Sequence, residues 1–190
     1  WDRRVCIGVV NMNSRYAQAM VDQVSAVAMA IGLRPGDPGC RPNVLILADS
    51  DGDALARWMV EGDPQFFRPD IGNTNLGPDA LEYFQSSSAP IRWWQVTAQR
   101  PSQFGPTASR IRGSYEEGLS HIIIILDMSR IGTVSFASLA DYVSMVSLAQ
   151  VDSQVDASGF DSVLNLFAEN GSRSLRMTDW DLAYLRGLYT

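Results

Sequence analysis

An α+β domain built on a mixed, partly parallel sheet is the architecture predicted for this 190-residue sequence. Two apolar runs, at residues 5–10 and 43–47, flank one amphipathic helical segment, and this spacing favours a right-handed parallel crossover. The segment His121–Asp127 is almost continuous isoleucine, which is typical of a central strand covered on both faces. Residues 136–151 are apolar nearly all round, which predicts a buried helix.

The N-terminal half continues from its first strand into a long helix. Apolar residues recur every three or four positions, which predicts a helix over residues 14–33 with Gly32 at its end. The acidic turn Ala48–Asp53 then precedes a predicted short helix over residues 54–60. From residue 62 to 90, frequent proline, glycine and serine predict a loop, and its aromatic side chains indicate that it packs against the core.

Residues 91–97 form the next predicted strand, with Trp93 and Trp94 on opposite faces of the sheet. A polar loop is expected over residues 99–107, followed by a short edge strand over residues 109–112. These two strands and the isoleucine strand would complete the sheet.

The chain closes with a predicted helix over residues 178–189. The Thr178 hydroxyl can cap its first turn, and Asp179 and Asp181 favour the positive end of the helix. The sequence shows no internal repeat and no linker, so residues 1–190 are expected to form a single domain.

The composition limits the chemistry that the chain can perform. All 15 basic residues are arginine, and without lysine neither Schiff-base chemistry, a lysine general base nor a Walker-type phosphate loop can be built. His121 is the only histidine, so no site can contain two imidazoles. The formal net charge of −6 argues against nucleic acid and anionic membrane as partners.

The sequence also predicts export and a disulfide. No apolar run reaches the roughly 20 residues that a transmembrane helix needs. The start at Trp1 fits a matured exported protein, periplasmic or extracellular, whose signal peptide has been removed; a trimmed chain is the alternative. Cys6 lies at the start of the first predicted strand and Cys40 lies three residues before the second. If these strands are parallel neighbours, both thiols lie near the same sheet edge, where a disulfide can form, with two buried free thiols as the alternative.

The acidic turn resembles a calcium-binding loop only in part. Asp49, Asp51 and Asp53 have the alternating spacing of such a loop, but Ala54 and Val60 stand where it needs a glycine and an acid. A helix cap by Asp51 or Asp53 needs no ion and is the favoured interpretation.

Two further residues are weighed as catalytic candidates. Asp127 ends the isoleucine strand, where α/β proteins often place functional groups, although a turn acid paired with Arg130 is favoured. Any Ser-His-Asp triad would have to use His121, but no GxSxG elbow accompanies it. A glycan hydrolase using Asp127 and a second acid is the enzymatic alternative, and it predicts an open cleft holding two carboxylates.

The C-terminal part of the chain resembles the end of a matrixin-like metzincin protease. A buried helix at 139–151 is followed by a turn carrying Ser162-Val163-Leu164 and by a closing segment, Thr178–Tyr189, that ends in leucine and tyrosine. In that family the active-site helix precedes a methionine turn and a closing helix, so the resemblance implies a zincin-like domain. The chain is also similar to an uncharacterised family of bacterial exported proteins that share the CRPN segment Cys40–Asn43.

The chain departs from this family at the zinc site. Metzincins bind zinc through H-E-x-x-H-x-x-G-x-x-H. On the buried helix this motif falls on Asp141, Tyr142, Met145, Leu148 and Val151, with Leu164 in place of the turn methionine. One carboxylate, a thioether and a valine cannot hold zinc. The resemblance therefore implies a pseudoenzyme without catalytic residues, metal or cofactor. The acidic, lysine-free composition favours another envelope or extracellular protein as its partner, and a structural subunit of a larger assembly is a further possibility.

Overall fold

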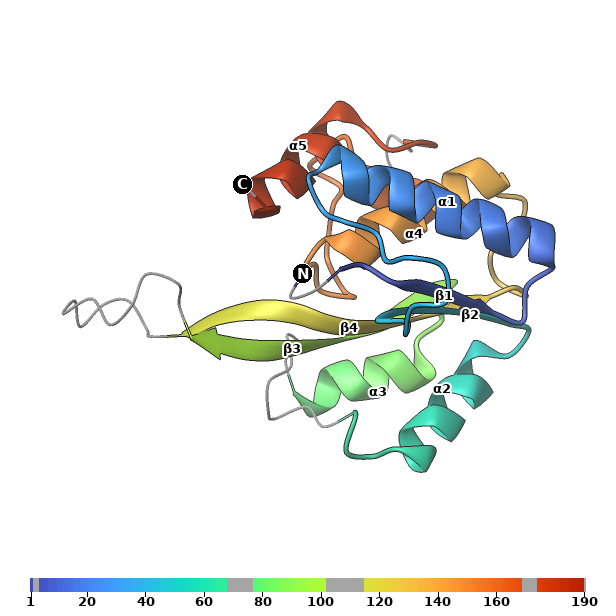
Figure 1. The fold of residues 1–190 in the computed structure, drawn as a ribbon. Helices are drawn as coiled ribbons and strands as arrows, with labels where there is room; N and C mark the ends of the chain where they lie inside the picture. The colour runs from blue at the N-terminus through green and yellow to red at the C-terminus, as the bar shows by residue number, and fades with distance from the viewer. Residues whose placement is uncertain (2–3, 68–76, 102–114, 169–173, 190) are drawn as a thin grey trace.

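The computed structural model describes residues 1, 4–67, 77–101, 115–168 and 174–189 and has the predicted α+β architecture (Figure 1). Within these ranges, four strands form one mixed sheet in the order β1-β2-β4-β3. Strands β1, β2 and β4 are parallel, and β3 pairs antiparallel with β4 at the sheet edge. The strands are β1 (Ile7–Val10), β2 (Val44–Asp49), β3 (Ile91–Pro101) and β4 (Tyr115–Asp127).

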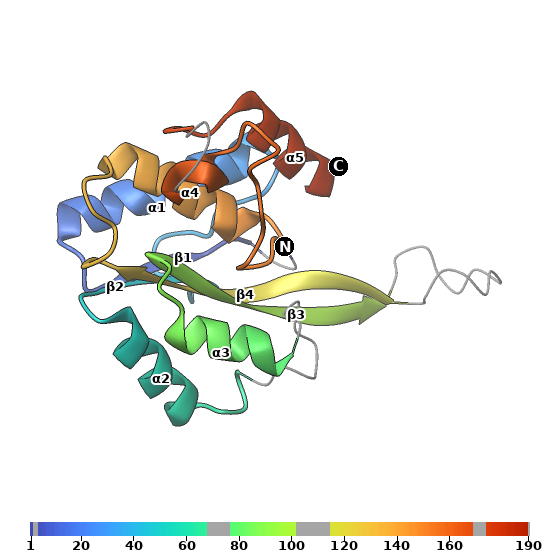
Figure 2. The same ribbon diagram turned by 180° about the vertical axis from the view of Figure 1, so that it is seen from behind.

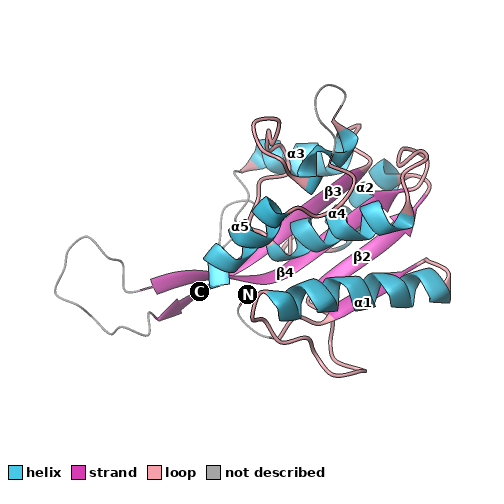
Figure 3. Ribbon diagram, turned by 90° about the horizontal axis from the view of Figure 1, so that it is seen from above, coloured by secondary structure: helices cyan, strands magenta, loops and turns pink. Residues whose placement is uncertain are grey.

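Helices cover both faces of the sheet. On one face α1 packs against α4, with α5 beside them, whereas α2 and α3 cover the other face (Figures 1 and 2). Seen from above, α1 and α4 run along the strands (Figure 3). The helices are α1 (Ser14–Ala30), α2 (Gly52–Gly62), α3 (Pro78–Ser86), α4 (Phe136–Leu148) and α5 (Asp179–Tyr189), with a 3-10 turn, η1 (Val163–Phe167), between the last two.

Alternating side chains of the strands produce two apolar cores. Ile122 faces α1 and α4, whereas Ile123 faces α2 and α3. Trp93 and Trp94 divide in the same way, which confirms their predicted placement on opposite faces. The sheet therefore separates a larger core from a smaller one.

Helix α1 ends at Ala30, before the predicted boundary at residue 33. Gly32 adopts a left-handed φ of +87°, and the N–H of Leu33 donates to the carbonyl oxygen of Ala28 at 2.9 Å. This Schellman-type ending places Gly32 just after the helix, in a left-handed conformation that residues with a Cβ atom rarely adopt.

Helix α4 is shorter than the predicted helix over 136–151. Ala149 is extended, because side chains of β3 bind the carbonyl groups that follow the helix. Gln95 Nε2 donates to the carbonyl oxygen of Ala149 at 3.0 Å, and Trp93 Nε1 donates to that of Val151 at 3.2 Å. The apolar periodicity of the sequence continues past Leu148, but the backbone becomes extended there and its carbonyl groups bind side chains of the edge strand β3.

The interpretation of residues 62–90 as a loop was wrong, because this segment contains α3. Gly77, with φ of +99°, precedes the helix and Pro78 opens it, and proline is favoured at a first helical position. Glycine and proline had counted as evidence for the loop. Phe67 and Phe84 are buried in the smaller core, which confirms that the aromatic residues of this segment pack down.

Strand β3 continues to Pro101 and so includes the start of the loop predicted over 99–107. The edge strand predicted over 109–112 lies outside the described residues. The closing helix begins one residue later than predicted, since Thr178 precedes α5 as its cap. Among the described helices, none combines the length and the apolar character that a membrane span requires.

The predicted disulfide between Cys6 and Cys40 is confirmed, with the Cα atoms 6.1 Å apart. Strands β1 and β2 pair in parallel from Ile7 opposite Val44, so both cysteines lie at the amino end of the sheet. The bridge closes a loop with a sequence separation of 34 residues. Loop closure of this length stabilises a fold by about 3–4 kcal/mol in the chain-entropy model.

Candidate functional site

Helix α4 carries two of the three positions that the resemblance aligns with zinc ligands, Asp141 and Met145, and it lies in the interior, whereas Val151 follows the helix. Every residue from Ser138 to Leu148 is buried, between α1, the sheet and η1. Met145 has no exposed surface, whereas Val151 and Leu164 are partly buried. The helix therefore presents apolar side chains to the larger core.

Asp141 is the one acidic residue among these positions, and both oxygens of its carboxylate accept hydrogen bonds from protein donors. Its Oδ1 accepts from Gln23 Nε2 of α1 at 2.7 Å, and its Oδ2 accepts from Arg176 Nε at 2.6 Å and from the N–H of Met177 at 3.0 Å. These bonds compensate the burial of a side chain that is only 3% exposed. They also join α1 and the segment before α5 to α4.

Tyr142 lies at the position that the resemblance aligns with the glutamate base. Its ring packs edge-on against Trp93 and Phe167, at centroid distances of 6.4 and 5.2 Å. Burial raises the pKa of the Tyr142 hydroxyl far above its ordinary value, so the phenol is protonated at neutral pH. A neutral phenol and one engaged carboxylate do not match the donor set that zinc requires. The residues present at this position do not fit a zinc ion.

A cavity of about 360 Å³ adjoins Tyr142, between β3 and the segment before η1. Asp156 supplies the one carboxylate among its lining residues. Hydrogen bonds from the Ser158 side chain and from the Ser158 N–H, the latter at 2.9 Å, lower the pKa of the Asp156 carboxyl group. A glycan hydrolase needs two facing carboxyl groups, one of them with a raised pKa, and this cavity does not supply them.

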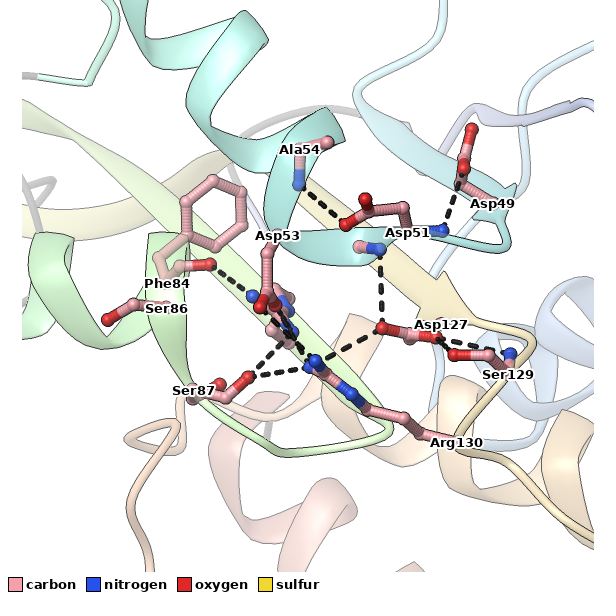
Figure 4. Close-up of polar contacts among 12 residues, drawn as sticks. Asp49, Asp51, Asp53, Ala54, Phe84, Ser86, Ser87, Asp127, Ser129 and Arg130 are labelled. Carbon is pink, nitrogen blue, oxygen red and sulfur yellow. Dashed lines mark hydrogen bonds and ion pairs between the residues drawn. The ribbon is translucent and has the colours of Figure 1, made fainter.

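The second candidate region is the carboxyl edge of β2 and β4, where Asp49 lies opposite Asp127 in the register (Figure 4). Asp51 accepts from the N–H of Ala54 at 2.9 Å and so caps α2. Asp49 accepts from the N–H of Asp51 at 2.9 Å. The helix cap favoured over a calcium ion is therefore present at this turn.

Asp127 is held at the positive end of α2. Its Oδ1 accepts from the N–H and the hydroxyl of Ser129, at 3.1 and 2.6 Å, and its Oδ2 accepts from the N–H of Gly52 at 3.2 Å. Arg130 Nη1 lies 3.4 Å from the same Oδ2, in the favoured turn pair. A Cβ at Gly52 would lie 3.2 Å from the Asp127 Cβ, so glycine permits this close approach.

A buried arginine of β3 completes this region, and it had not been singled out from the sequence. Arg92 is fully buried and donates to Asp53 Oδ1 at 2.6 Å and to the carbonyl oxygens of Phe84 and Ser87 at 3.2 and 2.7 Å. Arg130 donates to both oxygens of the same carboxylate, at 2.9 and 3.1 Å (Figure 4). The Arg130 hydrogen bond is the main cause of the lowered pKa of Asp53. The signal available in the sequence was that Arg92 is the one charged residue of the predicted strand over residues 91–97, because an arginine buried in a sheet needs paired acceptors.

The two ends of the sheet keep His121 and Asp127 apart. His121 stands near the amino end of the parallel part of β4, with Nδ1 2.9 Å from Ser120 Oγ, and Asp127 ends the strand. Six strand residues span about 20 Å. The sheet therefore does not bring these two residues into a triad.

Within the ranges that the structure describes, no group of three or more histidine, cysteine, aspartate and glutamate residues is placed to hold a metal ion. The acids at the carboxyl edge bind backbone N–H groups and guanidinium groups instead. Comparison of the chain with family models, curated proteins and solved structures finds no match. Function is therefore inferred from the geometry of these residues.

Proposed function

We propose that the chain is a non-catalytic binding or structural protein, a zincin-like pseudoenzyme that acts through protein–protein contacts in the cell envelope or outside the cell. The observation that carries this proposal is the environment of Asp141. Its two oxygens accept three hydrogen bonds from protein donors inside the fold. In a zinc site those oxygens would face an open coordination position.

The arrangement of the elements supports the zincin-like part of the proposal. A long helix, α1, packs on α4, and the last parallel strand lies beside an antiparallel edge strand. The turn η1 and the closing helix α5 then follow α4. A buried helix, a turn and a closing helix are the order that the resemblance to matrixin-like metzincins implies for the C-terminal part of the chain.

The disulfide and the composition support the proposed compartment and partner. Disulfides such as Cys6–Cys40 persist in oxidising compartments, which favours the periplasm or the cell exterior. An acidic, lysine-free chain disfavours nucleic acid and anionic membrane. Another envelope or extracellular protein is therefore the proposed partner.

Metal analysis tests the pseudoenzyme proposal. The full chain, incubated with zinc and then dialysed, is expected to retain far less than one zinc ion per chain. An Asp141→Asn variant should give the same result. The matched control is Asp49→Asn, which alters a carboxylate at the carboxyl end of β2 instead of on α4. Stoichiometric zinc that is lost in Asp141→Asn but kept in Asp49→Asn would overturn the proposal.

An assay of oligosaccharide cleavage tests the hydrolase alternative. A non-catalytic protein leaves a panel of soluble oligosaccharides intact. Turnover by the wild-type chain that disappears in Asp127→Asn and persists in Asp156→Asn would instead identify a carboxylate enzyme. Mass spectrometry of the sugars distinguishes the two results.

A further inference from the structure

Two adjoining cavities lie near the amino end of β2 and the middle of β4, away from Asp127 at the carboxyl end of β4. The first has a volume of about 660 Å³ and is lined mainly by the loop that carries Cys40 of the disulfide. The second, of about 520 Å³, opens between α2 and the sheet. Arg41, Pro42, Asn43 and His121 line both cavities, so these residues form their junction.

The second cavity has the character of a ligand site. Its volume falls within the range of small-molecule pockets, which are mainly apolar with a few polar groups. Trp58 stands at its wall with 71% of its surface exposed, although a large indole is normally covered. Strands β2 and β4, helix α2 and the turn that follows α2 supply its apolar lining. The apolar side chains are Leu45, Trp58, Met59, Phe66, Phe67 and Ile123.

The junction carries a cation, Arg41, that no carboxylate of the described residues pairs with. Arg41 is exposed, and it donates no hydrogen bond to any residue that the structure describes. The two acids that line the cavities already have donors. Asp37 accepts from Arg4 at 2.8 Å, and Asp63 accepts from the N–H of Phe66 at 3.1 Å.

We propose that the joined cavities bind an amphiphilic carboxylate. Its alkyl or aryl body lies against the apolar wall of the second cavity, and its carboxylate pairs with the Arg41 guanidinium at the junction. A guanidinium matches the two oxygens of a carboxylate in a bidentate pair. A singly charged head suits the site better than a phosphate dianion, because Asp37 and Asp63 line the same cavities. This binding site is independent of the proposed pseudoenzyme function.

Calorimetric titration with decanoate, below its micelle concentration, tests the site on the full chain. Decanol and decyltrimethylammonium are the matched probes, since they keep the ten-carbon chain but lack the carboxylate. Decanoate is expected to bind saturably at one site. Decanol should bind about tenfold more weakly, because it cannot make the charge-assisted pair, and the cation should not bind.

Variants separate the head from the body of the ligand. Arg41→Gln should weaken decanoate binding about tenfold and leave decanol binding unchanged, whereas Trp58→Ala should weaken both. Arg57→Gln is the control, because Arg57 is an exposed arginine of α2 that lines neither cavity. All three residues are exposed, and circular dichroism checks that each variant folds. Decanoate that fails to saturate, decanol that binds equally well, or equal effects of Arg41→Gln and Arg57→Gln would overturn the proposal.

Discussion

Arg92 carries a full charge into the smaller core, and hydrogen-bond acceptors around its guanidinium group compensate the cost of burying that charge. Three oxygens, from Asp53, Phe84 and Ser87, accept from its terminal nitrogens. Its Nε has no partner among the described residues, and an unsatisfied buried donor costs about 1–3 kcal/mol. The network therefore has little capacity to lose another acceptor.

Replacement of Asp53 by asparagine should lower the free energy of unfolding by about 2–3 kcal/mol at neutral pH, because it leaves the buried Arg92 charge without its counter-ion. The Arg130 hydrogen bond lowers the pKa of Asp53 below the unfolded value of about 3.9. The contribution of this carboxylate is therefore complete above that value and is lost as the pH falls through the lower folded pKa. Urea unfolding at a series of pH values measures this difference, which should shrink below about pH 4.

The matched control for Asp53→Asn is Asp79→Asn, in the exposed first turn of α3. This substitution should change the free energy of unfolding by about 0.5 kcal/mol or less. A pH-independent difference between Asp53→Asn and the wild-type chain would contradict the assigned ion pair.

At the scale of the elements, α5 illustrates how a helix end is attached to its neighbours. Thr178 Oγ1 accepts from the N–H of Asp181 at 3.1 Å, and Asp181 Oδ2 accepts from the N–H of Thr178 at 2.9 Å. This reciprocal capping box confirms the predicted role of the Thr178 hydroxyl. Asp181 is fully buried and also accepts from the hydroxyl of Ser162 and the N–H of Val163, so the cap joins η1 to α5.

Replacement of Asp181 by alanine should lower the free energy of unfolding by about 2–4 kcal/mol, because it removes a cap and leaves buried donors unsatisfied. Asp179→Ala provides the control, since Asp179 lies in the same turn but is exposed. Its expected loss is about 0.5 kcal/mol, from the helix dipole alone. Denaturant unfolding compares the two variants, and equal losses would rule out the buried cap as the cause.

The start of α3 and the end of α4 could not be predicted from the local sequence pattern. Gly77 and Pro78 are favourable both in a turn and at a helix start, and the packing of Phe84 against the sheet selects the helix. Ala149 could continue α4, yet Gln95 of β3 binds its carbonyl group and the chain extends. Contacts with another element decide both boundaries.

At the scale of the whole molecule, the sheet divides the protein into layers of unequal burial. Helix α4 is enclosed on all sides in the larger core. Helices α2 and α3 rest on the smaller core and expose much of their surface to solvent. Local opening needs less free energy where fewer apolar contacts must be broken.

Hydrogen exchange should therefore distinguish the two helical layers. Backbone amides of α4 and of the central strand β4 are expected to exchange most slowly, and those of α2 and α3 faster. Helix α1 is the internal reference, because it packs on the larger core with one face and exposes the other. Native-state exchange followed by mass spectrometry measures the order, and protection of α2 equal to that of α4 would be inconsistent with this layering.

Composition and local periodicity predicted the strand–helix–strand start and the buried isoleucine strand, and they favoured the Cys6–Cys40 bridge over two free thiols. Each of these depends on neighbours in sequence or on strands that pair directly. They also excluded chemistry that needs lysine or a second histidine. The meeting of Asp53 with Arg92 and the cavities around Arg41 became visible only in the folded chain. Such groupings join side chains from separate elements, and their distances are set by how the layers pack rather than by any spacing along the sequence.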